Sequence, residues 1–310
     1  MEVFRDLSGV RKDRECVLTV GTFDGVHRGH QFIIAELKKR AQAGGLRTTL
    51  VTFEPHPQLV LKSSAKPALQ ILTTIAEKLQ ILEQLNLDRV VVIEFTREFA
   101  STSSQDFVRR ILFESIGFQE IVIGHDHAFG KNREGDIATL RQLAAEIGFR
   151  VDELPAFTID DGVISSTAIR NLLHDGRVQE ANRYLGQNYS LSATVIKGEG
   201  RGKRLNFPTA NLKPDAESKL IPGDGVYAVH LKIAERLFKG MMNIGVRPTF
   251  GEMKHTIEVH IFNFDDAIYG KHLTVYFVDK IRDEMRFAGP AELIKQLEED
   301  KTKSLKILQN

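Results

Sequence analysis

Residues 21–30 bring together residue types that can hold a phosphate group. They read Gly-Thr-Phe-Asp-Gly-Val-His-Arg-Gly-His. The imidazoles of His27 and His30 can donate hydrogen bonds to phosphate oxygens without adding the fixed charge of a lysine. No Gly-Lys-Ser/Thr follows, which excludes a P-loop, and the spacing differs from the Gly-x-Gly-x-x-Gly of dinucleotide sites. A glycine turn with incidental surface histidines is the alternative interpretation.

The flanking segments predict the elements that position this turn. Residues 16–20 form an apolar run, Cys-Val-Leu-Thr-Val, which is typical of a buried parallel strand. Apolar residues at 33, 34, 37 and 41 then fall on one helical face. A strand, a glycine turn and a helix start in this order make a nest of backbone amides that binds phosphate.

A second helix start at residues 165–170, Ser-Ser-Thr-Ala-Ile-Arg, has a similar chemical character. Its three hydroxyl groups and free backbone amides, with the guanidinium of Arg170 one turn in, make a second anion clamp. A well-capped helix with a solvent-facing arginine is the alternative.

The strand predicted at 46–53 ends in Glu-Pro-His-Pro, and the two prolines stop it. Ligands of open α/β sheets bind at the carboxyl ends of strands. Phe53 and His56 are therefore candidate pocket residues, although a rigid turn with an exposed histidine explains the pattern equally well.

The loop at 124–136 contains His125, Asp126 and His127 within three residues. In an extended segment both histidines face one side, which is compatible with a metal site, but no third ligand follows at the usual spacing. An ordinary ligand-binding loop is the favoured interpretation.

The second half of the chain holds a glycine-rich basic loop and a strand with an isolated carboxylate. Gly198, Gly200 and Gly202 alternate with charged residues, which suits phosphate binding, a flexible basic loop or a nucleic-acid contact equally. The strand at 256–260 alternates, placing Glu258 on the face opposite its apolar neighbours. A lone strand glutamate is ordinarily solvated.

Length and composition narrow the class of protein. The 310 residues suffice for two domains with their own cores, and 42 basic residues nearly balance 41 acidic ones. We therefore expect no nucleic-acid or membrane partner. The single cysteine, Cys16, excludes an intramolecular disulfide and favours a buried thiol in a reducing compartment. With no signal segment at the amino terminus and no long apolar run, a cytoplasmic protein is expected.

The predicted elements divide the chain into 1–185 and 186–310. In the first part, strands at 46–53, 89–95 and 120–123 alternate with helices, which predicts a doubly wound parallel sheet of the α/β class. From Tyr189 onward, short β-rich runs without helices predict an antiparallel barrel or sandwich, followed by a helix from Pro290.

These motifs resemble a known family. His-x-Gly-His at 27–30 resembles the signature of nucleotidyltransferases and class I aminoacyl-tRNA synthetases. The full string at 21–30, with Thr-Phe-x-Pro-His-Pro at 52–57, resembles the adenylylating half of bacterial bifunctional riboflavin kinase/FAD synthetases. Ile-Ser-Ser-Thr-x-Ile-Arg at 164–170 is similar to the second nucleotidyltransferase signature, and Phe-Pro-Thr-Ala-Asn at 207–211 to the riboflavin kinase signature.

The resemblance implies a Rossmann-like nucleotidyltransferase domain followed by a β-barrel riboflavin kinase domain. The barrel would phosphorylate riboflavin with ATP to FMN, with Glu258 as base and with Thr209 and Asn211 as ligands of Mg²⁺. The first domain would adenylylate FMN with a second ATP to FAD and pyrophosphate, using His27, His30 and Arg170. No tightly bound redox cofactor is implied. Where the family usually has glycine, this chain has Asn206, and asparagine tolerates positive φ better than most residues.

The remaining site residues also come from the resemblance. For ATP they are Gly21, Phe23, Asp24, Gly29, Ser165, Ser166, Thr167, Gly198, Gly200, Gly202, Lys203 and Asn243. For the flavin they are Phe53, His56, Asp126, Phe129 and Arg282. Two alternatives remain: one half is active while the other only binds flavin, or the chain is an RNA-binding or flavin-sensing protein.

Overall fold

The computed structural model describes residues 1–61, 68–125, 127–160, 162–198, 202, 205–249 and 252–309. The chain folds into two compact units, Met1–Ser166 and Thr167–Asn310. None of the helices within the described ranges is long and apolar enough to cross a membrane.

The first unit is built on a six-stranded sheet of order β1-β4-β3-β2-β5-β6, in which every pair of neighbours is parallel. The strands are β1 (Glu2–Phe4), β2 (Cys16–Val20), β3 (Arg47–Glu54), β4 (Arg89–Glu94), β5 (Glu120–Gly124) and β6 (Arg150–Leu154). The predicted parallel sheet is confirmed. Strand β1 was not predicted, because three residues are too few to display an alternating pattern.

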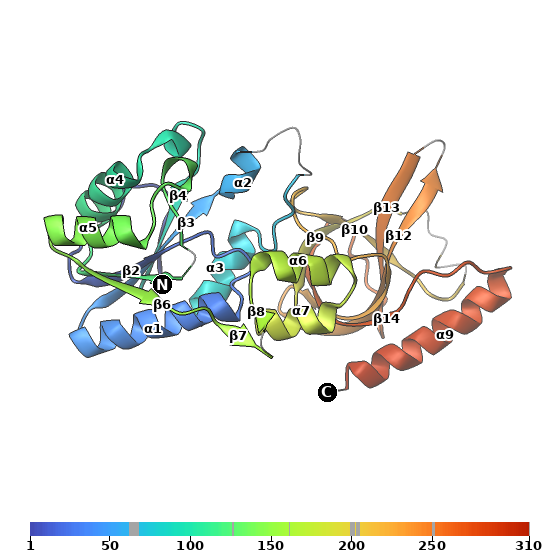
Figure 1. The fold of residues 1–310 in the computed structure, drawn as a ribbon. Helices are drawn as coiled ribbons and strands as arrows, with labels where there is room; N and C mark the ends of the chain where they lie inside the picture. Colours follow the sequence, from blue (N-terminus) through green and yellow to red (C-terminus); the bar gives the residue numbers. More distant parts are fainter. Residues whose placement is uncertain are drawn as a thin grey trace. The chain divides into compact units, whose positions relative to one another are not determined.

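Helices cover both faces of this sheet, as the doubly wound prediction requires (Figure 1). Alternate strand residues point to opposite faces, so Val17 packs with α1 and α3 while Leu18 packs with η2 and α5. Both faces are therefore apolar, which explains the continuous apolar runs. The helices are α1 (Arg28–Gly44), α2 (Pro57–Val60), α3 (Ile75–Gln84), α4 (Ser104–Asp106), the π-helix η2 (Phe107–Ile116) and α5 (Ile137–Ile147).

Short connecting elements complete the first unit. They are the 3₁₀ turns η1 (Phe99–Ser101) and η3 (Lys131–Arg133) and the hairpin strands β7 (Thr158–Ile159) and β8 (Gly162–Val163).

The ends of the helices follow local signals. Helix α3 begins with a capping box, in which the Thr74 hydroxyl accepts from the Glu77 amide and the Glu77 carboxylate accepts from the Thr74 amide. Helix α1 ends at Gly44 and is capped by Gly45, whose φ of 64° is the left-handed conformation common just after helix ends.

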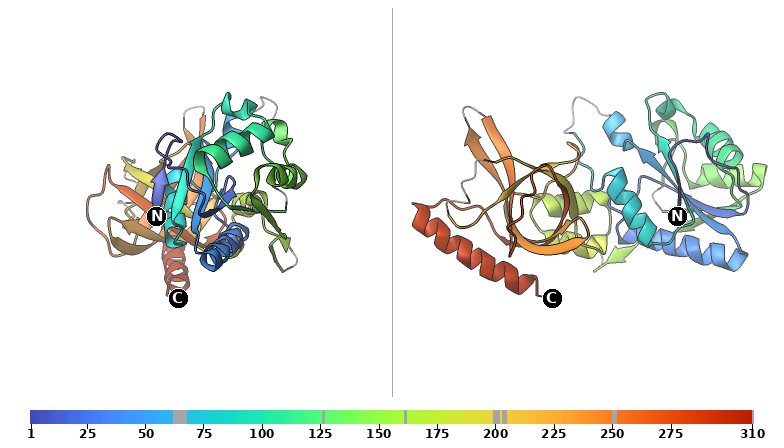
Figure 2. Two further views of the ribbon diagram at one scale, coloured as in Figure 1. Left: turned by 90° about the vertical axis from the view of Figure 1, so that its left-hand side faces the viewer. Right: turned by 180° about the vertical axis from the view of Figure 1, so that it is seen from behind.

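The second unit contains a closed six-stranded antiparallel barrel of order β10-β13-β12-β11-β14-β9 (Figure 2). Its strands are β9 (Ser190–Ile196), β10 (Ala210–Pro214), β11 (Gly225–Ile233), β12 (Arg236–Thr249), β13 (Glu252–Ile261) and β14 (His272–Arg282). The structure thus decides between the predicted barrel and sandwich in favour of the barrel, because β9 pairs with both β10 and β14.

Helix α9 (Pro290–Ile307) packs on the outside of the barrel and is the helix predicted from Pro290. Leu297 of this helix, and Leu308 directly after it, belong to the apolar cluster that includes Ala228 and Met241 of the barrel. Helices α6 (Ser166–His174) and α7 (Val178–Leu185) precede the barrel in the chain.

The unit boundary at 166/167 lies at the start of α6, so α6 and α7 belong to the same compact unit as the barrel. The division into functional domains at 185/186 stays a prediction.

Candidate functional site

The glycine turn at 21–27 leaves the carboxyl end of β2, whose five residues are all buried. The amide of Gly21 donates to the carbonyl of Val51 over 3.0 Å, which ties the turn to β3. Phe23 and Val26 have φ values of 47° and 41°, the left-handed region that a β-branched residue rarely adopts. Such strain costs on the order of 1–3 kcal/mol per residue and persists only where the surroundings hold it.

Asp24 supplies part of that hold. Asp24 is 1% exposed, and its carboxylate accepts hydrogen bonds from the amides of Leu72 and Thr73, at 2.9 and 3.0 Å to Oδ1. The hydroxyl of Thr73 accepts in turn from the amide of Gly25 over 3.0 Å. The carboxylate of Asp24, predicted to bind ATP, is therefore directed at the segment before α3; direct contact with ATP stays a prediction.

His27 and His30 form a stacked pair at the start of α1. The ring centroids are 3.6 Å apart at an interplanar angle of 17°, and Nδ1 of His27 accepts from the amide of His30 over 3.4 Å. A Cβ atom at Gly29 would lie 3.2 Å from the His27 ring, so glycine gives that ring its room. The ring of Phe23 lies 5.0 Å from that of His30. The structure thus brings together four of the predicted residues.

The state of His30 suits a neutral hydrogen-bonding group. Its Nδ1 atom is buried and has no hydrogen-bond partner among the described residues. Burial lowers the pKa of His30 well below its usual range, and the neighbouring His27 and Lys78 lower it further. The imidazole is therefore uncharged at neutral pH.

The second predicted clamp begins beside the first. Ser165 and Ser166 belong to the first unit, and the hydroxyl of Ser166 donates to the carbonyl of Asp24 over 3.0 Å. The start of α6 is thereby joined to the glycine turn across 142 residues of sequence. Thr167 and Arg170 follow within α6, and their part in the clamp stays a prediction.

Sequence reasoning missed Lys78. This lysine of α3 is 3% exposed, and its Nζ atom donates to the carbonyl of Thr22 over 2.8 Å and to the hydroxyl of Thr52 over 3.2 Å. A signal was available, since position 78 lies on the same helical face as Ile75 and Leu82, where a charge is unusual.

Aromatic rings gather at the carboxyl ends of β3 and β4. Phe53, predicted to contact the flavin, has ring centroids at 5.7 Å from Phe95, 6.0 Å from Phe99 and 6.3 Å from Phe107. Phe53, Phe95 and Phe99 are only partly buried. Phe95, at the end of the predicted strand 89–95, and Phe99, in η1, were not singled out from sequence, because only folding brings them beside Phe53.

Three further residues of this unit, Phe129, His56 and Asp126, were predicted to contact the flavin. Phe129 is 8% exposed and packs 6.1 Å from Phe107 in the core, with the ring of His127 stacked at 5.7 Å from its own. His56 caps the short helix α2, its Nδ1 accepting from the amide of Gln58 over 3.2 Å. Asp126 lies outside the described residues.

In the barrel, three predicted residues share one row across neighbouring strands. Glu258 on β13 is paired with Asn211 on β10 and with Asn243 on β12. Residues paired in this way project on the same face of a sheet. Just before β10, the hydroxyl of Thr209 donates to Oε2 of Glu258 over 3.2 Å. The predicted base and the two predicted metal ligands therefore lie together.

The glycine loop fits closely against these residues. A Cβ at Gly198 would lie 2.0 Å from Nδ2 of Asn211, and one at Gly202 would lie 2.3 Å from the carbonyl oxygen of Phe207. Asn206 adopts a φ of 61°, so asparagine accommodates the left-handed conformation as predicted. Gly200 and Lys203 lie outside the described residues.

Arg282 is engaged within the protein. Its Nε atom lies 3.0 Å from both carboxylate oxygens of Asp300, and one Nη atom lies 2.8 Å from Oδ2. Asp300 is fully buried, so this bidentate pair ties α9 to β14. A contact between Arg282 and a flavin stays a prediction.

Oxygen donors dominate the candidate metal site. Thr209 and Asn211 offer a hydroxyl and a side-chain amide oxygen, neutral donors that suit Mg²⁺ with its remaining ligands from phosphate and water, and Glu258 lies beside both. The described ranges contain no group of three or more His, Cys, Asp or Glu side chains that could hold a metal ion. The metal site considered from sequence at residues 125–127 includes Asp126, which lies outside the described residues.

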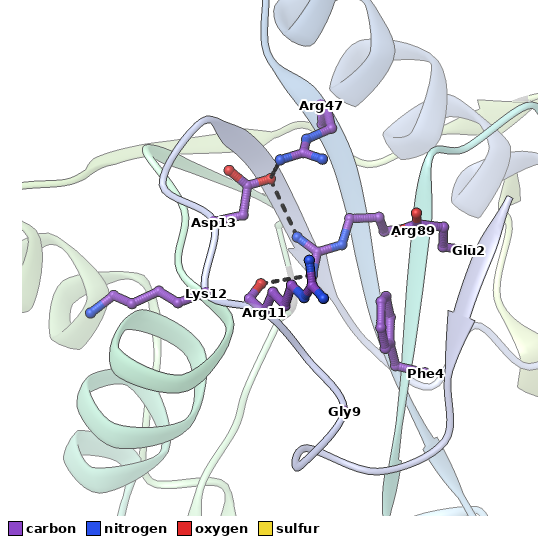
Figure 3. Close-up of a pocket in the computed structure, with 8 residues that line it drawn as sticks. All are labelled: Glu2, Phe4, Gly9, Arg11, Lys12, Asp13, Arg47 and Arg89. Atoms are coloured by element: carbon purple, nitrogen blue, oxygen red, sulfur yellow. Dashed lines mark hydrogen bonds and ion pairs between the residues drawn. The ribbon is translucent and has the colours of Figure 1, made fainter.

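A pocket lies at the amino-terminal edge of the first sheet, where β3 and β4 begin (Figure 3). Three of its charged residues form ion pairs: Asp13 accepts from Arg47 over 2.6 Å and from Arg89 over 3.3 Å. Arg89 also donates to the carbonyl of Arg11 over 3.0 Å and lies 5.2 Å from the Phe4 ring. The lining of this pocket includes none of the predicted site residues, and its ion pairs fasten the loop between β1 and β2 to the starts of β3 and β4.

Comparison with known proteins adds two family matches. A family model described as FAD synthetase matches residues 10–168, and one described as riboflavin kinase matches residues 185–308. The chain is 36% identical over 286 residues to a protein of Escherichia coli K12, covering 92% of this chain and 90% of the relative. It is 38% identical over 285 residues to a protein of Listeria monocytogenes, covering 92% and 90%.

A relative from Bacillus subtilis is 36% identical over 298 residues, covering 95% of this chain and 93% of its own. All three relatives carry the name bifunctional riboflavin kinase/FMN adenylyltransferase. A solved structure from Streptococcus pneumoniae, titled as a macrolide-efflux protein, is similar with a TM-score of 0.86 and 29% identity over 97% of both chains.

Proposed function

The chain belongs to the bifunctional riboflavin kinase/FMN adenylyltransferase family, and from this premise we propose which of its residues carry out each reaction. The enzyme phosphorylates riboflavin with ATP to give FMN, and adenylylates FMN with ATP to give FAD and pyrophosphate. Both family matches are present in one chain, in the order of the two predicted domains.

Glu258 is the proposed base of the kinase reaction. It accepts the proton of the riboflavin 5′-hydroxyl as that oxygen attacks the γ-phosphorus of ATP, and ADP leaves. The observation that carries this assignment is the hydrogen bond from the Thr209 hydroxyl to Oε2 of Glu258 at 3.2 Å. This hydrogen bond fixes the carboxylate of Glu258 beside a proposed Mg²⁺ ligand. The attacking hydroxyl of riboflavin has to lie close to that ion and its bound phosphate, and so within reach of Glu258.

Thr209 and Asn211 are the proposed ligands of Mg²⁺, together with ATP phosphates and water. When bound, Mg²⁺ neutralises charge on the transferred phosphoryl group. The fit of Asn211 against Gly198 supports the role, because the backbone of the glycine loop then lies beside the ligand amide. Asn243, in the same cross-strand row, is proposed to orient the nucleotide.

His27 and His30 are the proposed phosphate holders of the adenylylation reaction. The phosphate of FMN attacks the α-phosphorus of ATP, and pyrophosphate leaves. Because this nucleophile is already anionic, the protein has to orient the two phosphates and stabilise charge rather than remove a proton. The neutral state of His30 supports the role, since an uncharged imidazole still donates a hydrogen bond. Ser165, Ser166, Thr167 and Arg170 are proposed to hold the leaving pyrophosphate.

The partly exposed rings of Phe53, Phe95 and Phe99 are proposed to pack against the isoalloxazine ring of FMN. Their position at the carboxyl ends of β3 and β4 supports this, because ligands of open parallel sheets bind at that edge. A flat tricyclic ring and aromatic side chains stack favourably. We place the enzyme in the cytosol, where the lone buried Cys16 stays reduced.

The test is a product analysis. The purified chain is incubated with riboflavin, ATP and Mg²⁺, and FMN and FAD are resolved over time. FMN should appear first and FAD later, and FMN supplied with ATP should yield FAD directly. Accumulation of FMN without FAD, or FAD formation only from added FMN, would restrict the activity to one half.

A further inference from the structure

We propose that Lys78 is a positioning residue for adenylyl transfer, holding the turn at 22–26 in the form that presents His27 and His30 to phosphate. The inference rests on the proposed function of the first unit. Lys78 is 3% exposed, so it acts through the turn and not by touching substrate.

The contacts of Lys78 are made with the first residue of that turn. Its Nζ atom donates to the carbonyl of Thr22 over 2.8 Å and to the hydroxyl of Thr52 over 3.2 Å. The hydroxyl of Thr52 itself donates to the Thr22 carbonyl over 3.1 Å. Thr22 is thereby anchored to both α3 and β3 immediately before the chain enters the left-handed conformation at Phe23.

The turn needs such an anchor because its conformation is strained. Phe23 and Val26 both have positive φ, and neither is a glycine. Asp24, between them, is held by the amides of Leu72 and Thr73. Residues 72–78 therefore hold the turn at two points, at Asp24 through these amides and at Thr22 through Lys78.

Burying the charged ammonium group of Lys78 costs free energy, because the group loses its hydration. Burial lowers the pKa of Lys78, and the nearby carboxylates of Asp24 and Glu54 oppose that shift. A neutral side chain would fill the same space at lower cost. The positive charge of Lys78 also attracts a phosphate group bound at the turn, and the buried side chain does this without touching that group.

The same charge acts on His30. Lys78 and His27 both lower the pKa of His30, in addition to burial. Glu54 is a further titratable group near Lys78; burial raises its pKa against the influence of Lys78 and Arg5, and Asp24 adds to the rise. Removing the charge of Lys78 should therefore raise the pKa of His30.

The test compares Lys78→Met with Lys38→Met in the full chain. Lys38 on α1 is a matched control, since it also donates to a main-chain carbonyl, that of Leu85, over 2.8 Å. K78M should lower kcat/KM for FMN adenylylation by about 100-fold, the effect of a small misplacement of catalytic groups. Riboflavin phosphorylation by the same molecules should be unchanged. K38M should keep both activities within about twofold.

A pH profile separates positioning from general stability. In the wild type, the lowered pKa of His30 keeps its ring neutral as the pH falls, so the comparison between variants reports how far Lys78 contributes to that shift. In K78M, and in the hydrogen-bonding variant Lys78→Gln, the acid limb should move to higher pH. If K78M does not fold, K78Q alone carries this measurement.

Equal losses of adenylylation in K78M and K38M would overturn the inference, and so would an unmoved acid limb in K78Q. A wild-type chain that makes no FAD from FMN would instead overturn the proposed function of the first unit, and the inference with it.

Discussion

Thr209 and Glu258 meet where β10 begins beside β13, and the threonine hydroxyl donates to the carboxylate over 3.2 Å. The contact joins two residues that are 49 positions apart in sequence. It places a proposed metal ligand and the proposed base side by side, so the kinase chemistry has one location. The proposed phosphate-holding histidines lie in the other unit, which makes the two activities separable by mutation.

Replacing Glu258 tests this separation. Glu258→Gln should lower FMN formation by at least about 100-fold, because the riboflavin hydroxyl loses its proton acceptor. FAD formation from supplied FMN should be unaffected, as measured by separating the flavins chromatographically. Glu235→Gln is the control, since Glu235 is an exposed barrel carboxylate paired with Lys232. Parallel loss of both activities in E258Q would contradict the assignment.

Replacing both histidines of the glycine turn should have the opposite effect. A His27→Asn, His30→Asn double variant should convert FMN to FAD about 100-fold more slowly, because two donors to phosphate oxygens are lost. Phosphorylation of riboflavin by the same protein serves as the internal control and should persist. Rates for each step are measured with riboflavin or FMN as the starting flavin. If the double variant synthesised FAD at the wild-type rate, the two stacked histidines would not be part of the site.

A side chain at Gly198 should disturb the proposed metal site. In Gly198→Ala, the new Cβ would meet Nδ2 of Asn211 at 2.0 Å, so the amide has to move. We expect the Mg²⁺ concentration needed for half-maximal riboflavin phosphorylation to rise about tenfold, because displacing the groups that orient a metal ligand weakens metal binding by this order. Gly289→Ala is the matched control, because a Cβ there meets nothing within 4 Å. A Mg²⁺ dependence identical in both variants would argue against Asn211 as a ligand.

The buried pair of Arg282 and Asp300 should stabilise the second unit. Asp300→Ala leaves a guanidinium without its bidentate partner and should lower the free energy of unfolding by about 3 kcal/mol. Urea titration followed by circular dichroism measures the change. The neighbouring Glu299→Ala changes an exposed position of the same helix and should stay within about 0.5 kcal/mol. A D300A variant as stable as E299A would show that α9 is held by its apolar contacts alone.

Local pattern in the sequence determined the type and order of most elements and the place of the glycine turn with its two histidines. Residues 16–20 are all buried and were predicted as a parallel strand, and residues 256–260 alternate and were predicted as a strand of an antiparallel barrel or sandwich. These signals depend on neighbours a few positions apart, which the chain displays directly. The glycine turn and the start of its helix are also local, and so they were predicted in place.

Only the tertiary structure decided which groups hold those motifs. Lys78 reaches Thr22 across 56 residues, and the carboxylate of Asp24 turns to Leu72 rather than to solvent. Closure of the barrel depends on β9 meeting β10 and β14, and the bond between Arg282 and Asp300 depends on where α9 packs. Such contacts join distant segments, and their energies appear only once the chain is compact. The local pattern of a sequence does not specify which distant segment each group will meet.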